Sequence, residues 1–369
     1  MNYKFSFFIL FAGILFSACN KMKNKENTYS EYLYIDRFKE IEVNEIPLDF
    51  VDNKRYILLY SDDIDLQFKF ISKITIKEDL IYIMDGISKK LLIYDKKTGK
   101  ALNQVGERGN GPNEYIDISD FDIDENGNIY VIDGNLDRLF IYDNNLSLVK
   151  NEKLPFEADA VKVLNNGNFL FGLSSWNKGQ NEGDMVILTN DKFQTLKTLI
   201  TYDEFIDDSY WISEYYFTPI NNYILYNRPP YNTVYKIDDQ GNIVHSIHFD
   251  FGKEDVPNKE KKDIEKNLKN FENYNLLKGI TIVEDDYIIG IFRKKGENRA
   301  FFIDALNNVL YLLPERRTSD QSDVLGYFEK TLISCIIPGS EKANSKELPK
   351  YIKEELDNGN FVLCLYQLK

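Results

Sequence analysis

The stretch "GERGNGPNEY", residues 106–115, is the part of the chain whose residue types most resemble a chemical motif. Glycine-rich loops can wrap phosphate groups when a helix follows them. This segment lacks the G-x-x-x-x-G-K-[ST] spacing, contains no lysine and precedes a strand-like run. We therefore interpret it as a corner between two strands. If its face binds a ligand, Arg108, Asn110 and Glu114 are the candidate contacts.

Metal ligands are scarce in this sequence. The two histidines, His245 and His248, stand three residues apart in the strand-like run "NIVHSIHFDF". Positions three apart on a strand point to opposite faces, so they cannot grip one ion together. The run "DIDENG" (122–127) approaches a calcium loop, but the closing glutamate is replaced by Asp133. We predict a turn there, and no metal or cofactor.

Nucleophilic catalysis finds no recognisable pattern either. The chain has no G-x-S-x-G elbow, and neither histidine has a triad context. Cys335 and Cys364 lie in apolar strand-like runs, "LISCIIP" and "FVLCLYQL". They could pair if the strands are neighbours, but two buried thiols are the expected outcome. With 59 acidic residues, some carboxylates fall close together by chance. We assign no catalytic residue.

Aromatic residues offer a second candidate surface. Trp211 stands among tyrosines and acids in "DDSYWISEYYF" (207–217), and "YNRPPYN" (226–232) adds Arg228 and Tyr231. Aromatic faces beside fixed polar groups suit sugar or peptide binding. The alternative is a tyrosine-rich sheet core followed by a proline corner. Trp211, Arg228 and Tyr231 are therefore candidate binding residues.

An internal repeat indicates the framework that must position these residues. "IYIMDGISKKLLIYD" (81–95) aligns with "IYVIDGNLDRLFIYD" (129–143) without gaps, with eight of fifteen positions identical. Each copy predicts a strand, a turn opening at Asp85 or Asp133, and a second strand. With the flanking strands this makes four strands in about 48 residues, the size of one propeller blade. Both turns should lie beside the 106–115 loop, so Asp85 and Asp133 join the candidates.

Weaker copies of the unit continue to the C-terminus and predict six blades, with seven as the alternative. The run 39–48 is expected to complete the last blade, and 55–63 to lead into the first. Segments 256–279 and 347–359 show apolar residues at helical spacing. We expect their apolar faces to pack on the propeller, partner docking being the alternative. The predicted fold is all-β: a six-bladed β-propeller with two short inserted helices.

The N-terminal residues indicate export. Residues 1–18 read as a signal peptide, with Lys4 before an apolar run too short to span a bilayer comfortably. The run ends "LFSAC", which predicts a lipid on Cys19; the alternative is an ordinary secretory signal with an incidental cysteine. Residues 19–36 are polar and read as a flexible tether, and residues 37–369 as the propeller. We expect an outer-membrane lipoprotein that faces the periplasm and contacts the membrane only through its lipid. Surface display is the alternative.

Together, the lipobox, the tether, "GERGNGPNEY", the repeat, "YNTVYKID" and the terminal "VLCLYQLK" resemble the six-bladed β-propeller lipoproteins of Bacteroides-type bacteria, which are NHL-like propellers. The resemblance implies a fold and a location, not a reaction. A net charge of −14 argues against a nucleic-acid partner. We predict a non-enzymatic binding or assembly module for a protein, peptide or glycan. The alternative is a channel-centred enzyme, lactonase- or lyase-like, that could depend on a divalent metal.

Overall fold

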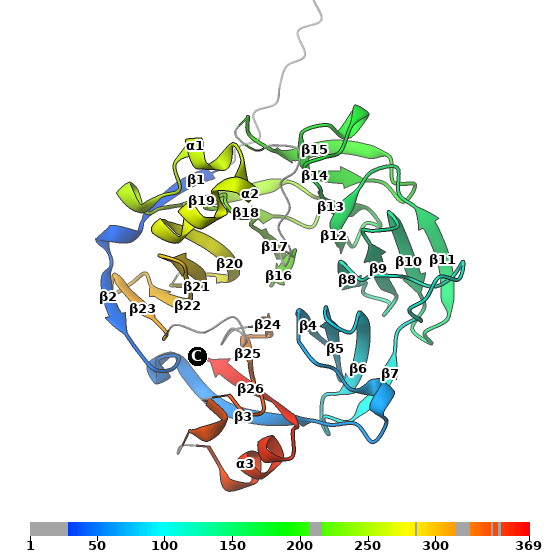
Figure 1. The fold of residues 1–369 in the computed structure, drawn as a ribbon, viewed down its shortest axis with the longest axis horizontal. Helices are drawn as coiled ribbons and strands as arrows, with labels where there is room; N and C mark the ends of the chain where they lie inside the picture. The colour runs from blue at the N-terminus through cyan, green and yellow to red at the C-terminus, as the bar shows by residue number, and fades with distance from the viewer. Residues whose placement is uncertain are drawn as a thin grey trace, which may run out of the picture.

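The computed structural model describes residues 29–204, 206, 216–284, 286–314, 325–340, 342–345 and 348–369. Six β-sheets stand side by side around a common centre, so the chain forms a six-bladed β-propeller (Figure 1). We number the blades 1 to 6 in chain order. The predicted signal peptide and Cys19 lie outside the described residues, and within them no helix is long and apolar enough to cross a membrane.

Blades 1, 2 and 3 are regular four-stranded antiparallel sheets whose first strand lies nearest the centre (Figure 1). Blade 1 contains β4 (Lys73–Lys77), β5 (Leu80–Asp85), β6 (Lys90–Asp95) and β7 (Ala101–Gln104). Blade 2 contains β8 (Asp120–Ile123), β9 (Ile129–Asp133), β10 (Arg138–Tyr142) and β11 (Leu148–Lys153). Blade 3 contains β12 (Ala158–Val163), β13 (Phe169–Leu173), β14 (Asp184–Thr189) and β15 (Thr195–Thr201).

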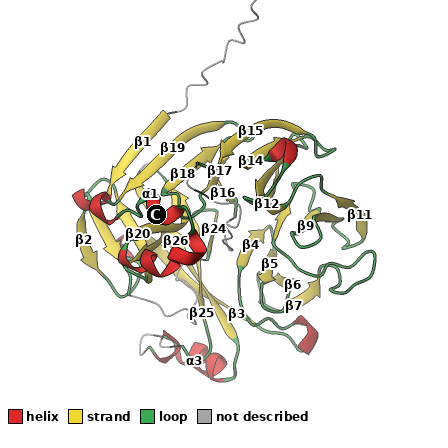
Figure 2. Ribbon diagram, turned by 45° about the horizontal axis from the view of Figure 1, so that its top comes forward, coloured by secondary structure: helices red, strands yellow, loops and turns green. Residues whose placement is uncertain are grey.

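Blades 4 and 5 each carry a fifth strand supplied by the N-terminal part of the chain. Blade 4 contains β16 (Thr218–Ile220), β17 (Tyr223–Tyr226), β18 (Thr233–Ile237) and β19 (Ile243–Asp250), with β1 (Tyr29–Tyr34) parallel to β19. Blade 5 contains β20 (Asn275–Val283), β21 (Tyr287–Lys294), β22 (Glu297–Asp304) and β23 (Val309–Leu312), with β2 (Lys39–Glu42) parallel to β23. Figure 2 shows β1 beside β19 at the outer edge.

Blade 6 closes the ring by joining the two ends of the described chain. It contains β24 (Gly326–Phe328), β25 (Thr331–Ile336) and β26 (Phe361–Leu368), with β3 (Val51–Leu59) antiparallel to β26 as the outer strand. The expectation for 39–48 is therefore wrong, because Lys39–Glu42 extends blade 5. The expectation for 55–63 is wrong as well, because most of that run belongs to β3. Residues 29–34 of the predicted tether form β1 instead of a free segment.

Helices are few, as predicted, and both predicted segments pack on the propeller. The first is broken into α1 (Asn258–Lys261), α2 (Ile264–Asn267) and a 3-10 helix, Leu268–Asn273. Its Ile264 and Phe271 are buried in a small apolar cluster. The second forms α3 (Lys350–Asp357), whose Ile352 and Leu356 pack against blade 6.

The core lies between the blades, because each blade presents two apolar faces. In β5, Ile81 and Ile83 pack toward blade 6, whereas Tyr82 and Met84 pack toward blade 2. Strands that are buried on both faces read as continuous apolar runs. Cys335 and Cys364 are likewise buried, form no disulfide, and lie in clusters on opposite faces of blade 6. Burial raises the pKa of the Cys335 thiol to about 12.

Candidate functional site

Residues 106–115 connect outer strand β7 to inner strand β8, as predicted, and the loop is internally ordered. The backbone N–H of Gly109 donates to the carbonyl of Tyr115 at 3.0 Å, and that of Tyr115 donates to Glu107 at 3.2 Å. The Gly111 N–H donates to the Glu114 carboxylate at 2.7 Å. The loop is therefore folded around the Glu114 side chain, which holds its backbone from within.

Two glycines in this loop are required by close packing. Gly106 has a positive φ of 63°, and a Cβ there would collide with the hydroxyl of Tyr142. A Cβ on Gly109 would collide with the Glu114 carboxylate. The loop is pinned beneath by Tyr115, which is fully buried and donates its hydroxyl to the Val105 carbonyl at 3.1 Å. Glycine is the residue that permits both the left-handed backbone and the close approach.

The three predicted loop contacts have different positions. Arg108 and Asn110 are exposed, whereas Glu114 is half-buried and engaged by the loop backbone. Arg108 donates from Nε to the carbonyl of Ile116 at 3.3 Å. In the part of the chain that the structure describes, Arg108 forms no ion pair. The loop therefore presents the Arg108 guanidinium and the Asn110 amide, while Glu114 supports them.

Asp85 and Asp133 lie at the same face of the ring but are fully buried. Oδ1 of Asp133 accepts the N–H groups of Asn135 and Leu136, both at 3.0 Å. Its Oδ2 accepts those of Ile116 and Asp117 at 2.8 and 3.1 Å. One carboxylate thus fixes both its own turn and the end of the incoming loop.

Asp85 repeats this arrangement in blade 1, where it accepts the N–H groups of Ile87, Ser88 and Lys69 at 2.9, 3.1 and 2.8 Å. The geometry therefore gives Asp85 and Asp133 a structural task. Their candidate role as ligand contacts has no support in it, since neither carboxylate is exposed.

Arg228 and Tyr231 lie between β17 and β18, at the junction of blades 3 and 4. Arg228 is 1% exposed and donates from Nη1 to the Leu173 carbonyl at 2.6 Å. Its guanidinium lies 5.2 Å from the ring centre of Tyr202. Tyr231 is half-buried, and its hydroxyl accepts the N–H of Asp203 at 3.0 Å. Arg228 therefore joins two blades from a buried position. The remaining candidate of this surface, Trp211, lies outside the described residues.

Charged side chains on the innermost strands link blades 1 to 3. Lys73 of β4 contacts Asp120 of β8 at 2.6 Å, and Lys162 of β12 contacts Asp122 at 2.8 Å. Asp120 also accepts the N–H of Val161 at 3.0 Å. Burial raises the pKa of Asp120 to about 6, against the lowering effect of Lys73. A perturbed pKa can mark acid–base chemistry. Here, however, the carboxylates are engaged in contacts that join strands of neighbouring blades.

The remaining candidate metal ligands are occupied by local contacts. Oδ1 of Asp124 accepts the N–H groups of Asn126 and Asn128, both at 2.9 Å, so the predicted turn at 122–127 is confirmed. His245 pairs with Glu31 at 3.5 Å, and His248 with Thr233 at 3.0 Å. Among the described residues, no group of three histidine, cysteine, aspartate or glutamate side chains could hold a metal ion.

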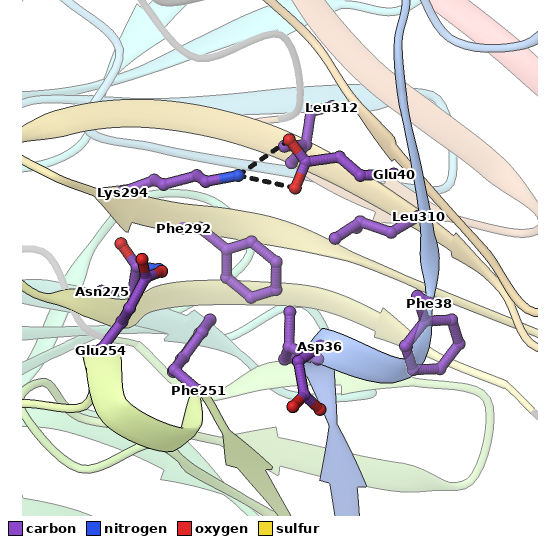
Figure 3. A pocket seen from close by; sticks show the side chains of 11 residues that line it. Asp36, Phe38, Glu40, Phe251, Glu254, Asn275, Phe292, Lys294, Leu310 and Leu312 are labelled. Atoms are coloured by element: carbon purple, nitrogen blue, oxygen red, sulfur yellow. Dashed lines mark hydrogen bonds and ion pairs between the residues drawn. The ribbon is translucent and has the colours of Figure 1, made fainter.

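Sequence reasoning missed a pocket between the N-terminal strands and blades 4 and 5 (Figure 3). Its volume is about 190 Å³, and it opens beside the 3-10 helix Ile35–Arg37 that connects β1 to β2. It is lined by Ile35, Asp36, Phe38, Glu40, Phe251, Glu254, Asn275, Phe292, Lys294, Leu310 and Leu312. No local pattern could reveal it, since its wall comes from segments far apart in the chain.

A second cavity, of about 370 Å³, lies between blades 1 and 2. It is bordered by the turns at Glu78 and Asn126, which connect the two inner strands of each blade, and by Asn144. These turns are at the opposite face from the 106–115 loop, because successive turns along an antiparallel blade alternate between its two ends. The cavity is therefore separate from the predicted loop surface.

Comparison with known proteins supports the fold directly. The "putative exported protein" of Bacteroides fragilis NCTC 9343 superposes with a TM-score of 0.71 at 18% identity, over 91% of this chain and 100% of that chain. A DUF4221 family member from Bacteroides vulgatus gives 0.53 at 9% identity, over 86% and 97%. A streptogramin B lyase gives only 0.47 at 12% identity, over 76% and 80%, a likeness too low to bear on chemistry.

The sequence itself identifies the family. No curated protein matches it. The model of a domain of unknown function, DUF4934, matches residues 48–336. This range begins at the 3-10 helix Leu48–Phe50, directly before β3, and ends with β25. The expected resemblance to six-bladed propellers of Bacteroides-type bacteria is thus confirmed for the fold, while the lipid anchor stays a prediction. This chain belongs to the DUF4934 family.

Proposed function

We propose that this protein is an exported, lipid-anchored propeller that binds a protein, peptide or glycan without catalysing a reaction. The observation that carries the proposal is the 106–115 loop. Its backbone is held by Glu114 and Tyr115, while Arg108 and Asn110 are exposed. A loop that is already ordered loses little conformational entropy when it binds, so its exposed polar groups can contribute more of their interaction energy.

The chemistry of the loop suggests what it would contact. A guanidinium offers several donors in a fixed plane and recognises carboxylates and carbonyl groups well. The Asn110 amide offers both donors and an acceptor. These groups suit a polypeptide backbone, an acidic side chain or a glycan. The buried carboxylate of Asp133 holds the end of the loop, and that of Asp85 holds the corresponding turn of blade 1, so neither faces the partner.

The enzyme alternative is the weaker proposal. The ionisable groups that meet at the inner strands are Lys73 with Asp120 and Lys162 with Asp122. The two carboxylates also accept the backbone N–H groups of Val161 and Val163. They act as links between blades and would need to be released before they could transfer a proton to a substrate.

Export and anchoring rest on residues 1–19 of the sequence and on the likeness to a protein that is itself described as exported. Replacement of the anchor residue, Cys19→Ala, should abolish incorporation of an alkyne-tagged fatty acid. The protein should then leave the membrane fraction. Labelling that persists in the variant would contradict lipidation at this position.

The binding proposal is tested by site-specific photo-crosslinking in cells. A photoreactive residue at position 110 should give discrete adducts, and these should disappear when Arg108→Glu is added. The matched control is position 145, an exposed residue in the turn at the other end of blade 2. Equal adducts at 110 and 145, or none at 110, would contradict the proposal.

A further inference from the structure

The pocket in Figure 3 has an aromatic floor. The rings of Phe251 and Phe292 meet edge to face, with centroids 5.1 Å apart and planes at 83°. Phe38 from the N-terminal segment lines the same space. One face of Phe292 stacks on Phe301 at 3.8 Å, which holds the ring in place. The floor therefore consists of phenyl groups from three separate segments of the chain.

Carboxylates surround this floor. Glu40 binds Lys294 through both oxygens, at 2.6 and 2.8 Å (Figure 3). The Glu254 carboxylate accepts a hydrogen bond from the Asn275 side-chain amide at 2.5 Å and forms an ion pair with Lys295 at 3.3 Å. Each lysine thus balances one of these two carboxylates.

The third carboxylate, Asp36, is exposed, and within the described residues it forms no ion pair. One negative charge is therefore left over at the rim of the pocket. The rim is therefore negatively charged, while the floor is apolar and aromatic.

We propose that this pocket binds an alkylammonium group, placing the cation over the phenyl rings and beside Asp36. Aromatic faces attract cations through the negative charge of the ring face, and several rings together form the known type of site for quaternary ammonium groups. The volume of about 190 Å³ suits this size. An apolar cavity of about 150 Å³ holds one benzene molecule, so a trimethylammonium or butylammonium group fits and a drug-sized ligand does not.

Neither an anion nor a neutral apolar group matches the pocket as well. An anion would approach Asp36, Glu40 and Glu254 with only the already paired Lys294 to receive it. A neutral apolar group would fill the floor but remove water from Asp36 without replacing it, which costs free energy. An alkylammonium group matches both parts, because its alkyl groups can contact the phenyl rings while its charge lies beside Asp36.

An alkylammonium group could come from a free small molecule or from a lysine side chain of another polypeptide. Calorimetric titration of the purified full chain separates these sources. Choline is compared with its neutral isostere 3,3-dimethylbutan-1-ol. Nα-acetyl-lysine methylamide, whose ε-ammonium group is free, is compared with the neutral Nα-acetyl-norleucine methylamide. We expect at least one cation to bind tenfold or more tightly than its neutral partner. The cation that binds identifies the source. Equal binding within each pair, or no binding of either cation, would overturn the proposal.

Variants assign the binding to this pocket. Phe38→Leu keeps the apolar contact but removes the ring, and Asp36→Asn removes the unbalanced charge. Each should weaken cation binding three- to tenfold and leave the neutral isostere unchanged. Glu42→Gln is the matched control, because Glu42 lies in the same N-terminal segment, on β2, but pairs with Arg299 at 2.9 Å and does not line the pocket. The affinity of the Glu42→Gln variant for the cation should stay within twofold of that of the parent protein.

Thermal unfolding of each variant shows whether the fold is retained. If Phe38→Leu and Asp36→Asn unfold like the parent yet bind the cation unchanged, the site is refuted. This inference is independent of the loop proposal, since residues 106–115 take no part in it and their variants should not change the titration.

Discussion

The contacts between blades 1 and 2 differ in kind from those between blades 4 and 5. Between blades 1 and 2, charged side chains reach from one blade to the next, as Lys73 does to Asp120. Between blades 4 and 5, phenyl rings dominate, and Phe249 packs against both Phe292 and Phe301. Polar links there come from amide side chains, as when Asn232 accepts the N–H of Leu277 and Asn221 donates to Glu284. Both regions have an apolar interior, but the polar contacts that join neighbouring blades are ionic between blades 1 and 2 and come from amide groups between blades 4 and 5.

The buried aspartates of the turns lie in the region where the repeat is clear. A buried carboxylate that must accept specific N–H groups tolerates few substitutions, so Asp85 and Asp133 stand at equivalent positions of both repeat copies. Apolar packing accepts many residues of similar volume. The sequence of blades 4 and 5 can therefore vary without loss of the fold, provided that the volume and the pattern are kept.

The largest expected effect is at Asp133. Asp133→Ala removes the acceptor of four backbone N–H groups and should lower the free energy of unfolding by about 3–4 kcal/mol. Urea denaturation measures the change. The control is Asp143→Ala, in a less buried turn that accepts the N–H groups of Asn145 and Ser147, which should cost about 1 kcal/mol. Equal losses in the two variants would show that burial is not what distinguishes them.

The next effect is a dependence of stability on pH that arises from Asp120, at the contact between blades 1 and 2. The pKa of Asp120 is raised from its ordinary 3.8 to about 6 by burial, so the folded protein holds this proton more tightly than the unfolded chain. Its contribution to stability is full below pH 3.8 and is lost as pH rises through about 6. Asp120→Asn lacks this contribution at every pH.

Denaturation of the parent and of Asp120→Asn between pH 4 and 7 measures this term. Over that window, the stability of the parent relative to the variant should fall by on the order of 2–3 kcal/mol. Two curves that stay parallel would mean that the Asp120 pKa is not raised in the folded protein.

Asn232 gives the corresponding test for the contact between blades 4 and 5. Its Oδ1 accepts the N–H of Leu277 at 2.9 Å, and its Nδ2 donates to Asp255 at 2.9 Å. Asn232→Ala should cost about 2 kcal/mol, because it leaves a buried N–H without its acceptor. Since the amide does not titrate, the direct loss should be nearly constant with pH, apart from any response of Asp255. If the stability loss caused by Asn232→Ala varied with pH as strongly as that caused by Asp120→Asn, the two blade contacts would not differ in their response to pH.

The smallest effect is expected at the exposed ion pair of Glu40 with Lys294. These side chains are 42% and 27% exposed, and pairs of this kind contribute about 0.2–1 kcal/mol. Glu40→Gln should therefore lower the free energy of unfolding by less than about 1 kcal/mol. Added sodium chloride should reduce the difference further by screening. A larger loss that salt does not change would place this pair with the buried contacts of blades 1 to 3.

Much of the fold was predictable because it depends on local patterns. The alternating runs and the repeat at 81–95 and 129–143 predicted strands, turns and the size of a blade, and six blades are confirmed. The outer strands were assigned wrongly at 39–48 and 55–63. Both runs have strand character, but the edge that each one joins is decided by pairing with β23 and β26, which are distant in sequence.

The candidate site was predictable in position but less so in role. The repeat correctly placed the 106–115 loop beside the turns at Asp85 and Asp133. It could not show that both aspartates are buried, because their partners are backbone groups whose position depends on the folded loop. The buried state of Arg228 was missed for the same reason. The pocket at Phe38 required three distant segments to meet, which no local pattern encodes.

The pairing of β3 with β26 has a consequence for how the molecule is made. Strand β3 emerges from the ribosome well before its partner β26, Phe361–Leu368, which is about 300 residues further along the chain. Until then β3 exposes an unpaired edge, the type of surface on which chains associate wrongly. The ring can thus close only after Phe361–Leu368 has been synthesised. A premature stop before Phe361 should yield an aggregating product, not a smaller propeller, so closure of the ring depends on the synthesis of β26.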